Sequence, residues 1–68
     1  MNKKESLLKI QINSMADYLV NELNYPYDVS MGIVFSSDTF HNLVNNEMYL
    51  NQGTLYVLDD LKRELANH

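Results

Sequence analysis

The side chains that could carry out chemistry in this chain are few, and their spacing fits neither nucleophilic nor acid–base catalysis. His41, which follows Phe40, is the one internal histidine and so the one internal imidazole base. Nucleophilic catalysis needs a base within hydrogen-bonding distance of the nucleophile and a group that orients it, and nothing near His41 supplies these. Asp59 and Asp60 are adjacent, but consecutive residues of a helix point about 100° apart. We therefore expect helix-surface residues here and no catalytic activity.

Metal and cofactor sites are not expected either. The chain has no cysteine, which excludes disulfides and thiolate ligands, and its two histidines, His41 and His68, are far apart in the sequence. The scattered carboxylates match no calcium loop. Two glycines, Gly32 and Gly53, are too few for a glycine-rich phosphate-binding loop.

The length and composition predict one small folded domain over residues 1–68. With 46% hydrophobic residues, five tyrosines and two phenylalanines, the chain is too apolar to remain disordered. A 68-residue domain has a small core, and without disulfides or metals the remaining source of extra stability is self-association or a partner. The net charge of −4 opposes binding to a phosphate backbone.

The hydropathy pattern predicts a cytoplasmic protein. No stretch approaches the roughly 18 uninterrupted apolar residues of a membrane span. Residues 1–14 combine early lysines with apolar positions, as a signal peptide does, but Lys9, Gln11 and Asn13 interrupt the apolar stretch and no small-residue cleavage site follows.

A helix is predicted over residues 6–24. Its apolar residues recur every three or four positions, as on one face of an amphipathic helix. They are Leu8, Ile12, Met15, Leu19 and Leu23, with Ala16 and Val20 beside them. Ser6 is the expected N-cap, and Pro26 should end the helix because proline disfavours helical geometry in the preceding residue.

Two shorter helices are predicted over residues 28–36 and 38–49. The first is ambiguous: Tyr27, Met31 and Phe35 fit a helical face, whereas alternate apolar residues within 27–37 fit a strand, and Gly32 weakens a helix by about 1 kcal/mol. Asp28 is its expected cap. The second carries its apolar residues on one side, namely Phe40, Leu43, Val44 and Met48.

The last predicted helix covers residues 54–66. Thr54 is its expected cap, acidic residues precede basic ones as the helix dipole favours, and four leucines share one face. These are Leu55, Leu58, Leu61 and Leu65. A hairpin over residues 48–58, turning at Gly53, is the alternative. The expected fold is thus an all-α bundle of about four helices.

The tyrosines and methionines indicate an interaction surface, because such a small core cannot enclose all of them. Aromatic residues and methionine are enriched at protein interfaces. The candidate interface residues are Tyr25, Tyr27, Met31, Met48, Tyr49 and Tyr56.

The C-terminal segment EMYLNQGTLYVLDDLKREL resembles a family of short bacterial proteins of unknown function. The family pattern is tyrosine, two variable residues, leucine-histidine, a turn ending in glycine, tyrosine, two apolar residues, two acids and an aliphatic residue. It is filled here by Leu50, Gly53, Tyr56, Val57, Leu58, Asp59, Asp60 and Leu61. Asn51 stands where the family has histidine, so any role of that imidazole is absent. The segment MADYLVNEL is similar to the family's first helix.

This resemblance implies an all-helical protein. Because some members are encoded beside ADP-ribosyltransferase-like toxin domains, it also implies an accessory or antitoxin-like role. Together with the composition, this favours a non-enzymatic module that binds protein, either as a homo-oligomer, most simply a dimer, or with another partner. The alternative is a small DNA-binding regulator built from short helices; the net acidity and the absence of a basic helix count against it, and we expect no nucleic-acid partner.

Overall fold

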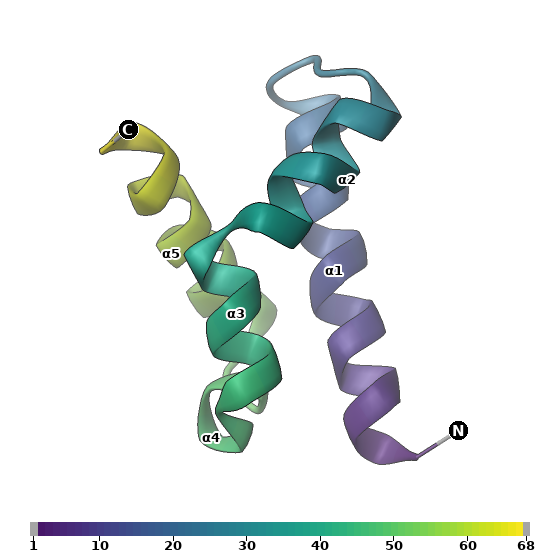
Figure 1. Ribbon diagram of the computed structural model, residues 1–68, viewed down its shortest axis with the longest axis vertical. Coiled ribbons are helices and arrows are strands. Elements are labelled where there is room, and N and C mark those ends of the chain that lie inside the picture. Colours follow the sequence, from purple (N-terminus) through teal and green to yellow (C-terminus); the bar gives the residue numbers. More distant parts are fainter. Residues whose placement is uncertain (1, 68) are drawn as a thin grey trace.

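The computed structural model describes residues 2–67, and every regular element in that range is a helix. The five helices are α1 (Lys3–Asn21), α2 (Tyr27–Ser36), α3 (Asp38–Asn45), α4 (Glu47–Leu50) and α5 (Thr54–Ala66). In Figure 1, α1 runs the length of the molecule, α2 folds back over its upper part, α3 and α4 continue downward, and α5 returns behind α3. The expected all-α bundle is confirmed, with one more helix than predicted.

The first helix, α1, begins and ends three residues earlier than the predicted 6–24. The N-cap is Asn2, not Ser6: the Asn2 Oδ1 accepts a hydrogen bond from the Glu5 N–H at 2.8 Å. At the other end, Asn24 has a φ of 60°, a left-handed conformation that asparagine adopts more readily than most residues. The Tyr25 N–H then donates to the Leu19 carbonyl at 3.1 Å, which closes the turn.

The ambiguous segment 27–37 is the helix α2. Pro26 occupies the N-cap position with a φ of −57°, which suits its ring, and Asp28 lies in the first turn instead of capping it. There, its carboxylate faces the positive end of the helix dipole. Gly32 has a negative φ and tolerates the helical geometry, so the strand alternative is wrong.

The predicted helix over residues 38–49 is in fact two helices, separated at Asn46. This residue is extended, with φ −138° and ψ 105°, and its Oδ1 accepts a hydrogen bond from the Tyr49 N–H at 3.1 Å. Its own N–H donates to the Asn42 carbonyl. One asparagine therefore ends α3 and caps α4. Ser37 does the same between α2 and α3, with its Oγ accepting from the Phe40 N–H at 3.0 Å.

The last helix, α5, has the predicted bounds, and the hairpin alternative is wrong. Gly53 occupies the N-cap position and Thr54 is the first helical residue, so the expected threonine cap is not formed. Leu61 is fully buried, but Leu55 is 77% exposed and does not share the buried face. Val57 takes that place in the core.

All five helices contribute to one small hydrophobic core. Its buried apolar residues are Met15, Ala16, Leu19, Val34, Leu43, Leu50, Val57 and Leu61. Leu58 and Leu65, which were predicted on the apolar face of the last helix, are partly buried against this core. Leu23, which was predicted on the apolar face of the first helix, is exposed. Within residues 2–67, no helix is long and apolar enough to cross a bilayer.

Candidate interaction surface

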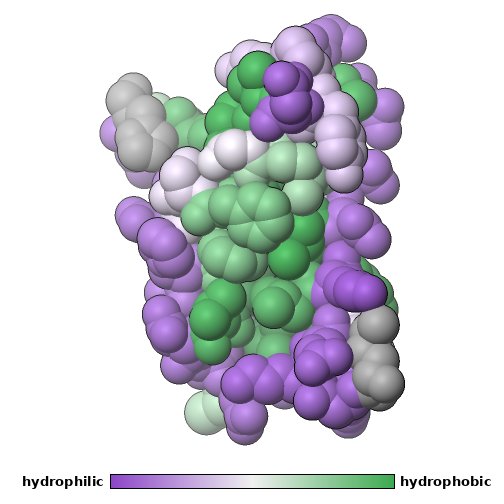
Figure 2. Space-filling model, turned by 45° about the vertical axis from the view of Figure 1, so that its right-hand side comes forward, coloured by the Kyte–Doolittle hydropathy of each residue, from purple (hydrophilic) through white to green (hydrophobic). Residues whose placement is uncertain are grey.

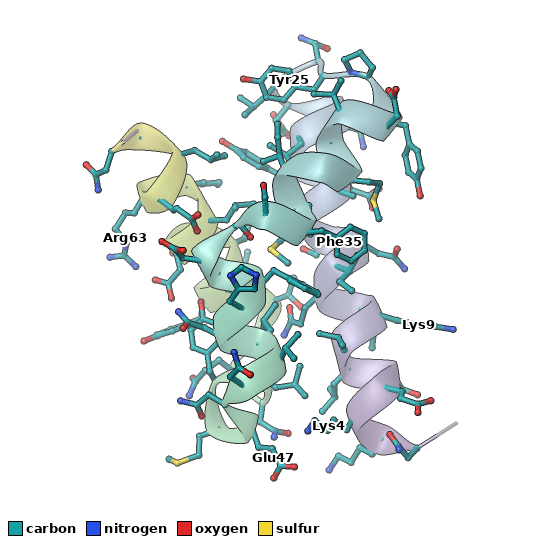
Figure 3. The ribbon with its side chains drawn as sticks, viewed as in Figure 1. Lys4, Lys9, Tyr25, Phe35, Glu47 and Arg63 are labelled. Carbon is teal, nitrogen blue, oxygen red and sulfur yellow. The ribbon has the colours of Figure 1, made fainter. Side chains whose placement is uncertain are left out.

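The six residues predicted as an interface lie in two groups at opposite ends of the molecule. Tyr25, labelled at the top of Figure 3, lies in the α1–α2 connection. Tyr27 is the first residue of α2, and Met31 follows one turn later. The others come from α4 and the first turn of α5, at the bottom of Figure 1. They are Met48, Tyr49 and Tyr56. Met48 and Tyr27 are the most exposed of the six, at 80% and 67%. The six therefore do not form one continuous surface.

Tyr49 makes mainly internal contacts. Its hydroxyl donates to the Asp60 Oδ2 at 2.6 Å, and Arg63 donates to the Oδ1 of the same carboxylate at 2.8 Å. Its ring packs against the core and meets the Tyr56 ring edge-to-face at 6.1 Å. Burial, followed by the hydrogen bond to Asp60, raises the pKa of Tyr49 above its usual value. Tyr49 thus connects α4 to α5 through its hydrogen bond to Asp60, and the exposed Tyr56 ring packs against the Tyr49 ring.

Tyr49→Phe should lower the free energy of unfolding by about 1 kcal/mol, because it removes a partly buried hydrogen bond to a charged acceptor. The raised pKa of Tyr49 means that its phenol stays protonated in the folded state above about pH 10, where the unfolded chain releases the proton. Wild-type stability should therefore fall as the pH rises above about 10, with a shallower fall in the variant. Urea denaturation at pH 8 and at a series of alkaline pH values measures both effects. If the unfolding free energies of the wild type and the variant fell equally steeply above about pH 10, the raised pKa would not belong to Tyr49.

A carboxylate from α5 holds the start of α3. The Glu64 Oε2 accepts from the Asp38 N–H at 2.8 Å, while its Oε1 accepts from the Thr39 N–H at 2.9 Å and the Thr39 hydroxyl at 2.8 Å. These are helix-terminal amides that have no partner within α3. A hollow of about 280 Å³ lies beside this contact and includes Ser36 and Leu65 in its lining. Because Glu64 already accepts these three hydrogen bonds, we interpret it as a structural cap at the N-terminus of α3.

Exposed apolar side chains follow α2 and α3 along one side. Tyr27, Met31 and Phe35 are four residues apart and so share one face of α2. The Phe35 ring meets the Phe40 ring edge-to-face at 5.1 Å, and Val44 lies one turn beyond Phe40 on α3. Phe35 and Val44 are 47% and 42% exposed, and Met31 and Phe40 are half-buried. We call these five residues the α2–α3 stripe.

The stripe lies on a face that is hydrophobic over much of its length. Figure 3 shows Phe35 directed to the side of α2 that faces right, beside α1. Turning that side forward, Figure 2 shows a hydrophobic band running down the middle of the molecule between hydrophilic margins. The sequence prediction included Tyr27 and Met31 but missed Phe35, Phe40 and Val44. The four-residue spacing from Tyr27 to Phe35 was the signal that could have added Phe35.

The stripe also lies in a part of the chain with few charges. Of nine acidic and five basic side chains, only Asp28 and Asp38 lie between Tyr27 and Val44, the first and last residues of the stripe. Apolar residues with few charges are typical of the centre of a protein interface.

The described residues offer no grouping for metal or acid–base chemistry. Among residues 2–67, no three histidine, cysteine or acidic side chains come together in a way that could hold a metal ion. His41 is exposed, and its ring lies 6.1 Å from that of Phe40. His68 lies outside the described residues. Nothing at His41 positions a nucleophile or an orienting acid in the described interactions.

Several basic side chains have partners within the fold. Lys62 lies over the Tyr18 ring, 5.0 Å from its centre, and Arg63 is paired with Asp60. The Lys4 Nζ lies 3.7 Å from the Glu47 Oε1 across an exposed ion pair, and Figure 3 shows the two side chains near each other at the lower end. The basic residues thus lie on two helices, α1 and α5, and are not gathered on one.

Comparison with known proteins gives no match: no family model, no curated protein and no solved structure resembles this chain significantly.

Proposed function

We propose that this chain is a non-catalytic module that acts by binding protein through its exposed apolar surface. The observation that carries the proposal is the α2–α3 stripe, because it joins three exposed large apolar side chains to two half-buried ones on a face with few charges. Covering such side chains is favourable, at roughly 25 cal/mol for each Å² of apolar surface removed from water. Exposed apolar patches of this kind commonly mark interaction sites.

The size of the core supports the same function. Eight apolar residues are buried, whereas ten large apolar side chains remain exposed among the residues described. Domains of this length have little stability to spare, and a partner that binds only the folded state adds to it by mass action. The proposal therefore gives a physical role to surface that would otherwise lie uncovered in water.

The biological setting that we propose is an accessory or antitoxin-like role in the bacterial cytoplasm. It is supported by the resemblance of residues 47–65 to the family of short helical proteins described above. In such a role the chain would act by occupying a partner's surface and would have no turnover.

DNA binding receives less support. A recognition helix needs basic residues that contact phosphates, but α3 has none and α2 has none. The arginine and two of the lysines are engaged in the contacts given above.

The test is affinity purification of the tagged full-length chain from cells that produce it naturally, with quantitative mass spectrometry. The binding variant replaces three exposed stripe residues, Tyr27, Phe35 and Val44, with serine; the control is Leu55→Ser on α5. We expect the specific co-purifying protein, an untagged copy of the chain included, to fall at least about tenfold in the binding variant, which corresponds to about 1.4 kcal/mol of binding energy. The control should retain it. Equal recovery of all proteins by the wild type and the binding variant, or recovery of none, would contradict the proposal.

A further inference from the structure

Resting on this proposed function, we propose that the partner is a second copy of this chain, packed stripe to stripe about a two-fold axis. In such an arrangement, the same surface serves both subunits, so that the stripe must be complementary to itself. Phe35 is the middle residue of the stripe and should lie close to the axis.

Charge is the first argument for a second copy. Each chain has a net charge of −4, so most ways of bringing two copies together place like charges opposite each other. The stripe largely avoids this, because only two charged side chains, Asp28 and Asp38, lie between Tyr27 and Val44. A face with so few charges, paired with an identical face, carries little such repulsion.

The exposed apolar residues of α4 and the first turn of α5 lie closer to carboxylates. Leu55 and Tyr56 are close in sequence to Asp59 and Asp60, and Met48 follows Glu47 directly. Self-association through that end would bring these carboxylates toward their own copies in the partner, where like charges cost binding energy, although Lys4 and Arg63 partly offset the charges of Glu47 and Asp60. Of these two surfaces, the α2–α3 stripe is therefore the better suited to pairing with itself.

The stripe has the composition and the setting that a dimer interface needs. Two phenylalanines, a tyrosine and a methionine are residue types enriched at interface centres. Stable interfaces bury about 800 Å² per partner, which is less than a fifth of the 4542 Å² surface of one chain. The hydrophobic band in Figure 2 runs over much of the length of this face, so a side-by-side dimer can continue the contact beyond the stripe.

Sedimentation equilibrium of the purified full-length chain over a concentration series tests the inference. The wild type should approach twice the 7.9 kDa mass of one chain. Phe35→Asp and, separately, Val44→Asp should weaken dimerisation at least about 100-fold, because each places two unpaired carboxylates in the interface. Leu55→Asp adds the same charge at an exposed position of α5 and should change the dimer constant less than about threefold, which is under 1 kcal/mol. Helical circular dichroism checks the fold of each variant, and either stripe variant that retains it suffices for the comparison.

The outcomes separate this inference from the proposed function. A dimer that neither stripe variant weakens would overturn the inference. It would mean that the two copies bind through another surface. A wild-type chain that stays monomeric to about 1 mM, a concentration that corresponds to only about 4 kcal/mol of binding energy, would also overturn it. In that case, stripe-dependent recovery of a different protein in the affinity purification would preserve the proposed function, and recovery of none would remove both.

Discussion

Leu61→Ala is expected to lower the free energy of unfolding by about 3 kcal/mol. Leu61 is fully buried on α5 in the middle of the core, and replacing a buried leucine by alanine costs both its transfer from water and the cavity that remains. A domain of this length has a total stability of roughly 3–10 kcal/mol, at about 0.05–0.15 kcal/mol per residue. The change should therefore remove a large share of it, and the variant should be partly unfolded at 37 °C.

Leu55→Ala provides the matched control for this prediction. It makes the same chemical change in the same helix, but at a side chain that is 77% exposed, and should cost less than about 0.5 kcal/mol. Urea denaturation followed by circular dichroism measures both variants, at one low protein concentration so that self-association does not add to the result. Equal losses of stability would show that the burial assigned to α5 is wrong.

Glu64→Ala is expected to destabilise the fold by about 2 kcal/mol. The variant removes the acceptor for two backbone N–H groups and one hydroxyl at the start of α3. Loss of an N-cap costs about 0.5–2 kcal/mol, and Glu64 also links α5 to α3, so the effect should lie at the upper end of that range. Glu64→Gln retains one acceptor oxygen and should lose less.

Glu47→Ala is the control for Glu64. It also removes one carboxylate from a helix, but Glu47 is highly exposed and its ion pair with Lys4, at 3.7 Å, is a surface contact. Such pairs contribute about 0–1 kcal/mol, so the change in unfolding free energy should be small. A Glu64→Ala variant as stable as Glu47→Ala would contradict the assignment of Glu64 as the cap of α3.

The sequence predicted those parts of the fold that depend on local pattern. The apolar spacing of α1 and α5 placed Leu19 and Leu61 on the apolar faces of these helices, and both are buried. The order of acidic before basic residues supported α5 over a hairpin. For α2, the helical spacing of its apolar residues correctly predicted a helix despite Gly32. Burial of Val34 against the core stabilises this helix more than one glycine weakens it.

Features that depend on distant residues were not predictable in this way. Glu64 caps a helix that begins 26 residues earlier, and no local sequence pattern predicts such a contact. Gln11 is a polar residue, yet it is buried, and its Nε2 donates to the Gln52 carbonyl at 3.0 Å, which connects α1 to the α4–α5 connection. Asn46 was expected within a helix; it breaks that helix because its side chain caps the next one.

The candidate surface was only partly predicted for the same reason. Residue type singled out tyrosines and methionines, but it could not show that Tyr49 is held by Asp60 or that the chosen residues separate to opposite ends. The α2–α3 stripe exists because Ser37 ends α2 and caps α3, which brings the Phe35 and Phe40 rings together. That geometry belongs to the connection between the two helices and cannot be read from either helix alone.

The most direct test of the central claim, that the α2–α3 stripe is a binding surface for a second copy, is an NMR dilution series of the full-length chain. Amide chemical shifts of residues 27–46 on the stripe side should change with protein concentration, while those in the first turn of α5, around Leu55 and Tyr56, should stay constant. Spectra that do not change over a concentration range in which the mass rises from monomer toward dimer, or changes confined to the α4–α5 end, would contradict it.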